Sequence, residues 1–125
     1  MHQKFILASS SKSRYKILKN AGLNFTQKKP NCNEEDIKKT INRKTKPEIF
    51  AKKLSYEKAR SVSIKKLYAN KIVLGCDTVI YHNGKILDKV NSIEKAKKKI
   101  KFLSGKTHLI VSGLTICLNG SKIWE

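Results

Sequence analysis

Acidic residues, cysteines and long apolar runs are all scarce in this sequence, and each shortage excludes a class of protein. Of its 125 residues only 9 are acidic against 28 basic, a formal net charge of +19. The 3 cysteines, at positions 32, 76 and 117, form no Cys-x-x-Cys pair, so neither a disulfide framework nor a zinc site is indicated. No apolar run approaches the ~20 residues of a membrane span, and the first is too short for a signal peptide. We therefore expect a cytoplasmic protein with reduced thiols and no membrane partner.

The common nucleotide-binding and hydrolase motifs are also missing. The sequence contains neither G-x-x-x-x-G-K-[ST] nor G-x-G-x-x-G. Its 3 histidines, at positions 2, 82 and 108, fall in a terminus, a turn and a strand, and no nucleophile elbow accompanies them. A Ser/His/Asp hydrolase is therefore not indicated, and the few carboxylates become the first candidates for chemistry.

Lysine makes up most of the basic surplus, with 25 Lys and only 3 Arg. A domain that binds nucleic acid or another polyanion is one interpretation, because Lys and Arg neutralise phosphates and release counterions. Base readout and paired phosphate contacts favour Arg, however, and the lysines are dispersed, with one denser run at 95–101. We favour a solvated, lysine-rich surface and keep the polyanion-binding domain as the alternative.

The pattern of elements predicts one α/β domain over residues 1–125. An apolar strand at 4–8 passes through a turn rich in hydroxyls into a helix that Gly22 ends. A weak strand at 23–28 and a polar, acidic segment with a short helix follow. Two Asn-Gly turns, a helix capped by Ser92 and a strand at 107–118 complete the order.

A long helix is predicted from Pro47 to about residue 67. Its apolar side chains recur at four-residue steps, and Lys58 occupies one position in that line. Taken alone, this pattern indicates a lysine whose stem lies at the rim of the apolar face while its charge reaches water.

Two segments could carry chemistry. The run at 71–81 predicts a buried strand whose end delivers Asp77, where α/β sheets collect ligands, although a turn or capping aspartate is an equal alternative. The turn with Ser9 and Ser11 is either a helix cap or a phosphate site, in which helix N–H groups, hydroxyls and Arg14 hold the anion. Glu34, Glu35 or Asp36 could supply a second oxygen ligand for a metal, although an acidic surface loop is more common.

Several short motifs together resemble the Maf-like nucleoside triphosphate pyrophosphatases. They are LASSSKSR at 7–14, NE at 33–34, LSYEKA at 54–59, GCDT at 75–78, LDKV at 87–90 and LSGKTH at 103–108. They follow the family's order along the whole chain. Lys12, Asn33 and Val90 stand where many members have proline, aspartate and proline, and Ser13 stands where many have a second arginine.

The resemblance implies a mixed, twisted sheet flanked by helices with a nucleotide cleft, similar to inosine triphosphate pyrophosphatase. It implies hydrolysis of a nucleoside triphosphate to the monophosphate and pyrophosphate, on non-standard or pyrimidine nucleotides, with Mg or Mn. Asp77 would be the catalytic base and, with Glu34, a metal ligand. The residues implied to bind substrate are Ser9, Ser11, Arg14, Lys58 and Lys89.

Family members extend beyond the equivalent of Trp124, so we expect a domain that lacks the C-terminal third. Weak activity, marginal stability and self-association of the chain are the corresponding expectations. A homodimer is left open, and no specific nucleic-acid partner is expected.

Overall fold

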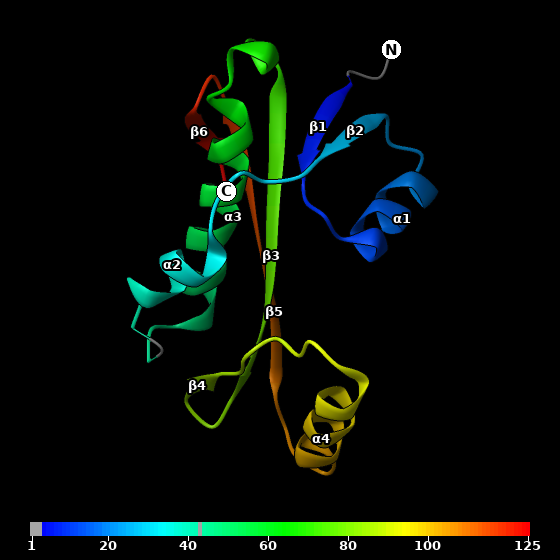
Figure 1. Ribbon diagram of the computed structural model, residues 1–125, viewed down its shortest axis with the longest axis vertical. Helices are drawn as coiled ribbons and strands as arrows, with labels where there is room; N and C mark the ends of the chain where they lie inside the picture. The colour runs from blue at the N-terminus through cyan, green and yellow to red at the C-terminus, as the bar shows by residue number, and fades with distance from the viewer. Residues whose placement is uncertain (1–3, 43) are drawn as a thin grey trace.

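The computed structural model describes residues 4–42 and 44–125, which form a sheet with helices on both sides (Figure 1). The strands are β1 (Phe5–Ala8), β2 (Phe25–Lys28), β3 (Ile72–His82), β4 (Lys85–Ile86), β5 (Leu109–Leu118) and β6 (Ser121–Trp124). The helices are α1 (Lys12–Asn20), α2 (Glu34–Lys39), α3 (Pro47–Ser63) and α4 (Ile93–Leu103), with a 3₁₀ turn, η1, at Lys66–Tyr68.

The sheet is mixed, as predicted. Its 6 strands run in the order β2-β1-β3-β5-β6, and β4 pairs with β3 outside this path. The β1 strand is parallel to both β2 and β3, whereas β3 and β5 form an antiparallel ladder from Ile72↔Leu118 to Tyr81↔Leu109. The parallel half therefore ends early, while the antiparallel pair extends well beyond it.

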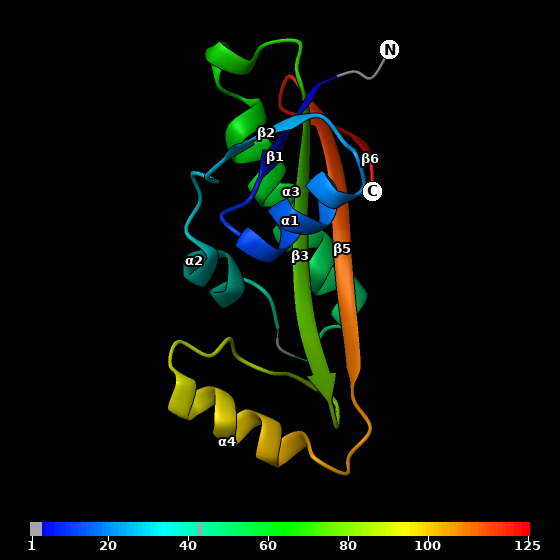
Figure 2. The ribbon, with the colours of Figure 1, turned by 90° about the vertical axis from the view of Figure 1, so that its right-hand side faces the viewer.

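The helices cover the sheet unequally. Figures 1 and 2 show α1 on one face and α3 on the other, with α4 set apart near the far end of β3. Helix α3 makes the main packing layer: its residues Phe50, Ala51, Leu54, Ala59 and Val62 are buried in the two apolar clusters. No helix among the described residues is long and apolar enough to cross a bilayer.

The turn chemistry of the sequence is confirmed. Asn83 and Asn119 have φ of 50°, and each is followed by a glycine at about 80°, so both hairpins use the paired left-handed residues that Asn-Gly favours. Gly22 also has a positive φ, and Ser92 caps α4 by accepting from the Lys95 N–H. These local rules operate independently of the rest of the fold.

The predicted end of the long helix is wrong by about one turn. Helix α3 ends at Ser63 rather than near residue 67, and a 3₁₀ turn follows. Ile64 and Leu67 are 55% and 80% exposed, so the apolar face stops contributing burial after Val62. Without that burial, helix propensity alone does not extend the helix.

Two glycines let α3 approach the sheet at backbone distance. A Cβ placed on Gly75 of β3 would overlap the Ser55 carbonyl oxygen and lie 2.8 Å from the Ala59 nitrogen. A Cβ on Gly113 of β5 would lie 2.6 Å from the Ala51 oxygen. Beside them, the buried hydroxyls of Ser55 and Thr115 form a 2.7 Å hydrogen bond between helix and sheet.

Gly75→Ala should destabilise the fold by about 3 kcal/mol or more, at the upper end of what overpacking costs, because the atoms in its way are backbone atoms that cannot rotate aside. Urea unfolding followed by far-UV circular dichroism measures the change. Ser112→Ala, on the opposite face of β5, is the control and should cost under ~1 kcal/mol. A Gly75→Ala protein as stable as the control would show that helix and sheet are not held this closely.

Candidate functional site

A gap in strand pairing opens the edge of β3. Its pairing with β1 ends at Ala8↔Gly75, and its pairing with β4 begins at Tyr81↔Ile86. Among the described residues, no strand lies beside positions 76–80 on that side. A sheet edge without a neighbour presents main-chain groups as well as side chains, and the candidate site lies here.

Asp77 lies within β3 and not at its end, which corrects the sequence-based placement. The strand continues to His82 because β5 pairs with it throughout, with Asp77 opposite Gly113. Asp77 is nevertheless just past the end of the parallel partner β1, and its side chain is fully buried. The carboxylate therefore lies beside the end of β1 and not at the end of its own strand.

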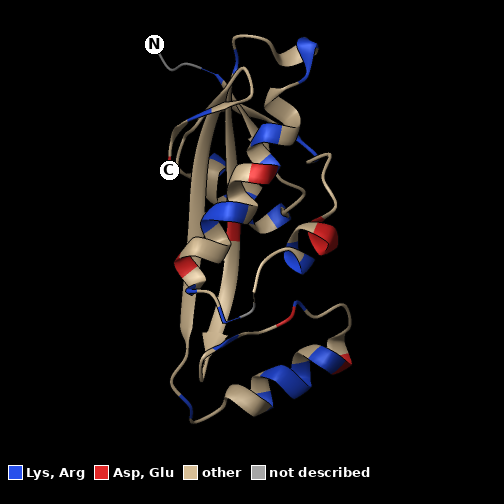
Figure 3. Ribbon diagram, turned by 90° about the vertical axis from the view of Figure 1, so that its left-hand side faces the viewer, with Lys and Arg blue, Asp and Glu red and all other residues tan. Residues whose placement is uncertain are grey.

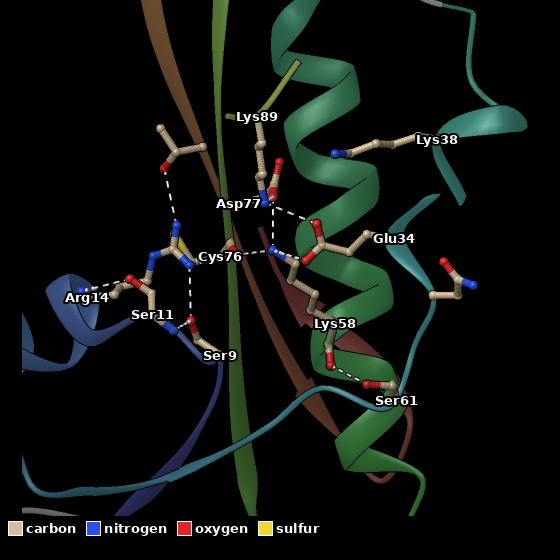
Figure 4. Close-up of polar contacts among 12 residues, drawn as sticks. Ser9, Ser11, Arg14, Glu34, Lys38, Lys58, Ser61, Cys76, Asp77 and Lys89 are labelled. Carbon is tan, nitrogen blue, oxygen red and sulfur yellow. Dashed lines mark hydrogen bonds and ion pairs between the residues drawn. The ribbon is translucent and has the colours of Figure 1, made fainter. Parts of the chain in front are cut away.

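Lys58 is buried against Asp77, so the rim position that the helix pattern alone indicated is wrong. Its Nζ lies 2.9 Å from Asp77 Oδ1 and 3.0 Å from Glu34 Oε1, and it also donates to the Cys76 carbonyl oxygen (Figure 4). Only 5% of the residue is exposed. Burial favours the neutral amine, but the two carboxylates outweigh it and raise the pKa of Lys58 above its ordinary value.

Glu34 joins two lysines at the mouth of the site. Its Oε2 accepts from Lys89 Nζ at 3.0 Å, and Lys89 Nζ is also 3.8 Å from Asp77 Oδ1. Partial burial opposes ionisation, yet contacts with Lys58 and Lys89 lower the pKa of Glu34 to about 2. The preceding Asn33 caps α2 through its side-chain oxygen, a role that asparagine fills as well as aspartate.

The hydroxyl-rich turn is a helix cap that also holds Arg14. Ser11 Oγ accepts from the Arg14 N–H, and the buried Ser9 Oγ accepts from both the Ser11 N–H and Arg14 Nη1. The guanidinium also donates to the Cys76 carbonyl and to Thr78 Oγ1, at 3.2 and 3.4 Å. A serine that accepts a hydrogen bond still has its own hydrogen to donate, so the turn retains donors for an anion.

These groups line one pocket with a volume of about 410 Å³. Its walls are the serine turn, Arg14, Pro30, Glu34, Lys58, Thr78 and Lys89. The fold therefore brings every predicted substrate-binding residue to one place, with Asp77 directly behind Lys58 and Lys89. An anion with several charged oxygens is the natural ligand of such a set of donors.

The carboxylates of the site leave one oxygen free for a divalent metal. The described residues contain no group of three or more His, Cys, Asp and Glu that could hold an ion by themselves. Asp77 Oδ2, however, is a buried oxygen without a hydrogen-bond partner, while both Glu34 oxygens contact lysines. One free carboxylate oxygen fits an ion that shares its coordination with phosphate oxygens, as Mg²⁺ commonly does.

Two further groups at the site were not predicted from the sequence. Thr78 belongs to the GCDT motif, and that motif was the signal that could have identified it as a partner of Arg14. The Cys76 carbonyl accepts from Arg14 and Lys58, but every residue has a carbonyl, so no sequence signal marks this one.

The interrupted sheet, with a pocket that three cations line beside a buried carboxylate, defines an α/β protein. The chain belongs to the Maf-like protein family, whose sequence profile matches residues 4–125.

Relatives with assigned names extend the comparison. The chain is 38% identical to a nucleoside triphosphate pyrophosphatase of Pelagibacter ubique (strain HTCC1062), covering 100% of this chain and 64% of the relative. It is 38% identical to a 7-methyl-GTP pyrophosphatase of Bartonella henselae, covering 95% of this chain and 59% of the relative. It is 35% identical to a dTTP/UTP pyrophosphatase of Thermotoga maritima, covering 95% of this chain and 55% of the relative. The chain thus spans about 60% of the length of such relatives.

Lys58→Met should destabilise the fold by about 3–5 kcal/mol, because it leaves the Asp77 charge buried without its nearest cation. Adding Asp77→Asn should recover part of that loss, which a double-mutant cycle from urea unfolding measures. Lys53→Met, which breaks the more exposed pair with Glu57, should cost under ~1 kcal/mol. Additive effects of Lys58→Met and Asp77→Asn would contradict a coupled pair.

Glu34→Gln should change how stability depends on pH. The folded-state pKa of about 2 lies below the ordinary 4.5, so ionised Glu34 stabilises the fold above pH 4.5. That contribution is lost as the pH falls from about 4.5 to about 2, so the glutamine variant should lose stability less steeply there. Denaturant titrations at successive pH values test this, with Glu35→Gln, whose side chain is 75% exposed, as control. Parallel curves for wild type and Glu34→Gln would refute the assignment.

Proposed function

We propose that the protein hydrolyses nucleoside triphosphates to the monophosphate and pyrophosphate. One observation carries the proposal: Arg14, Lys58 and Lys89 line a single pocket beside Asp77. Asp77 is a buried acid with one oxygen that has no hydrogen-bond partner. The pyrophosphatase names of the relatives agree with this reaction.

The three cations would hold the phosphate chain. Arg14 reaches the pocket from α1 on one face of the sheet and Lys58 from α3 on the other, so an anion at the edge of β3 meets donors from both sides. Ser9 and Ser11 add hydroxyls, and the start of α1 adds backbone N–H groups. Phosphate oxygens would take over contacts that the lysines now make with Glu34 and Asp77. The binding energy would therefore come from charges that the fold has already positioned.

Charge balance favours a divalent metal, Mg or Mn, as a cofactor. Glu34 and Asp77 already offset much of the charge of Arg14, Lys58 and Lys89, so a triphosphate brings more negative charge than the pocket neutralises. Asp77 Oδ2 is the first candidate ligand and Glu34 the second. When bound, the metal supplies charge neutralisation on the phosphate oxygens.

Asp77 would orient the attacking water and accept its proton. The Lys58 ammonium fixes Oδ1, so Oδ2 is the oxygen left to contact a water. Glu34 stays ionised at neutral pH because of its lowered pKa and keeps Lys58 and Lys89 in position. Loss of one such charge typically reduces turnover by about 10²–10³-fold.

Pyrimidine or otherwise non-standard nucleotides are the proposed substrates, in nucleotide-pool housekeeping, since relatives are named for dTTP/UTP and 7-methyl-GTP. A cytoplasmic location and a homodimer stay predictions from the sequence. Figure 3 shows Lys and Arg residues along α4 and α3, with Asp and Glu residues among them. This distribution favours the enzyme over the polyanion-binding domain, which steep salt dependence of nucleic-acid binding would instead support.

Asp77→Asn should lower pyrophosphate release by about 10²–10⁴-fold relative to wild type, because the amide cannot accept the proton. Triphosphate affinity should not fall, since the change removes a negative charge near the phosphates. Coupled pyrophosphate detection and calorimetric binding measure the two effects, and thermal melting confirms the fold.

Asp36→Asn, an exposed acid in the first turn of α2, is the matched control. A folded Asp77→Asn protein that keeps turnover within a few-fold of the control would overturn the catalytic role. Weakened binding with unchanged turnover at saturation would instead make Asp77 a structural ion-pair partner.

A further inference from the structure

A second pocket adjoins the phosphate pocket and differs from it in character. Its volume is about 150 Å³, and the two pockets share Thr78 and Lys89 in their walls. We propose that this second pocket receives the nucleobase and that Lys38 selects a base carrying a carbonyl group. The inference rests on the proposed function and goes further, because it names the part of the substrate that the chain distinguishes.

The apolar part of the wall suits a flat ring. Phe50 from α3, Val79 from β3 and Ile86 from β4 are buried core side chains that also border the space. Ligand pockets in proteins are largely apolar with a few placed polar groups, and those for drug-sized molecules are usually about 300–1,000 Å³. This smaller volume suits one ring system rather than a whole nucleotide, and the polar pocket beside it takes the rest.

Lys38 is the polar group best placed to read the ring. Its side chain is only 15% exposed, and its Nζ lies 3.7 Å from Glu35 Oε1, which is long for an ion pair. Figure 4 shows the ammonium extending from α2 toward the region of Asp77 and Lys89. Lys99 also borders the pocket, but its Nζ already donates to the Asp88 carbonyl oxygen at 2.7 Å.

The chemistry of an ammonium sets the preference. It has three donors and no acceptor, so it pairs with a ring carbonyl, as in uracil, thymine or guanine, and opposes an amino group in the same place. A site built to hydrogen-bond one group rejects an analogue that leaves its donor unpaired. UTP and CTP differ at this kind of position, because a carbonyl in one is an amino group in the other.

Calorimetric titration of the 125-residue chain with UTP, CTP and inorganic tripolyphosphate in EDTA tests the inference. Wild type should bind UTP about tenfold or more tighter than CTP, the scale of one hydrogen bond to a charged donor. Lys38→Met should bring the UTP to CTP ratio near one. Lys39→Met, an exposed neighbour that borders neither pocket, should preserve the ratio.

Leu87→Trp gives a second test, because it adds bulk to the wall of the second pocket. It should weaken UTP binding several-fold more than tripolyphosphate binding.

An unchanged UTP to CTP ratio in Lys38→Met, with all affinities lowered together, would reduce Lys38 to a general positive charge and overturn the inference. Equal wild-type affinity for UTP and tripolyphosphate would also overturn the inference, because the base would then add nothing to binding. The proposed binding of the phosphate chain would stand. Failure of wild type to bind any of the three would overturn the proposed function itself.

Discussion

The contact of α3 with the sheet at Gly75 and Gly113 is the constraint on which the site depends. No side chain separates helix from strand there, and the Ser55–Thr115 hydrogen bond fills the remaining polar space. This closeness places Lys58, one turn along α3 from Ser55, within 2.9 Å of Asp77. Because both charges are buried, each needs the other, and the helix position is coupled to the chemistry of the pocket.

The missing neighbour along β3 supplies the opening. Since β1 stops opposite Gly75 and β4 starts opposite Tyr81, the carbonyl of Cys76 lies at an uncovered edge. Arg14 and Lys58 both donate to that carbonyl, one from each side of the sheet. The short parallel strands thus create a site at the end of β1, beside the part of β3 that pairs only with β5.

Local rules made much of this fold predictable. Asn-Gly turns, Ser92 and Gly22 act through neighbouring backbone, so the sequence identifies them without knowledge of the tertiary structure. The place of Asp77 was predicted wrongly because an apolar run shows where a strand is buried and not where its partner ends. Lys58 was misplaced because its partners lie 19 and 24 residues away along the chain, in β3 and α2. The family motifs predicted both as site residues, but only the fold shows that Lys58 and Asp77 contact each other.

Product analysis on UTP tests the central claim most directly. The chain, incubated with UTP and Mg²⁺ and resolved by anion-exchange chromatography, should form UMP and pyrophosphate in equal amounts, however slowly. Formation of UDP and inorganic phosphate would contradict the account, because the cleaved bond would then be the outer one. A folded chain that binds UTP and yields no product in long incubations would equally contradict it.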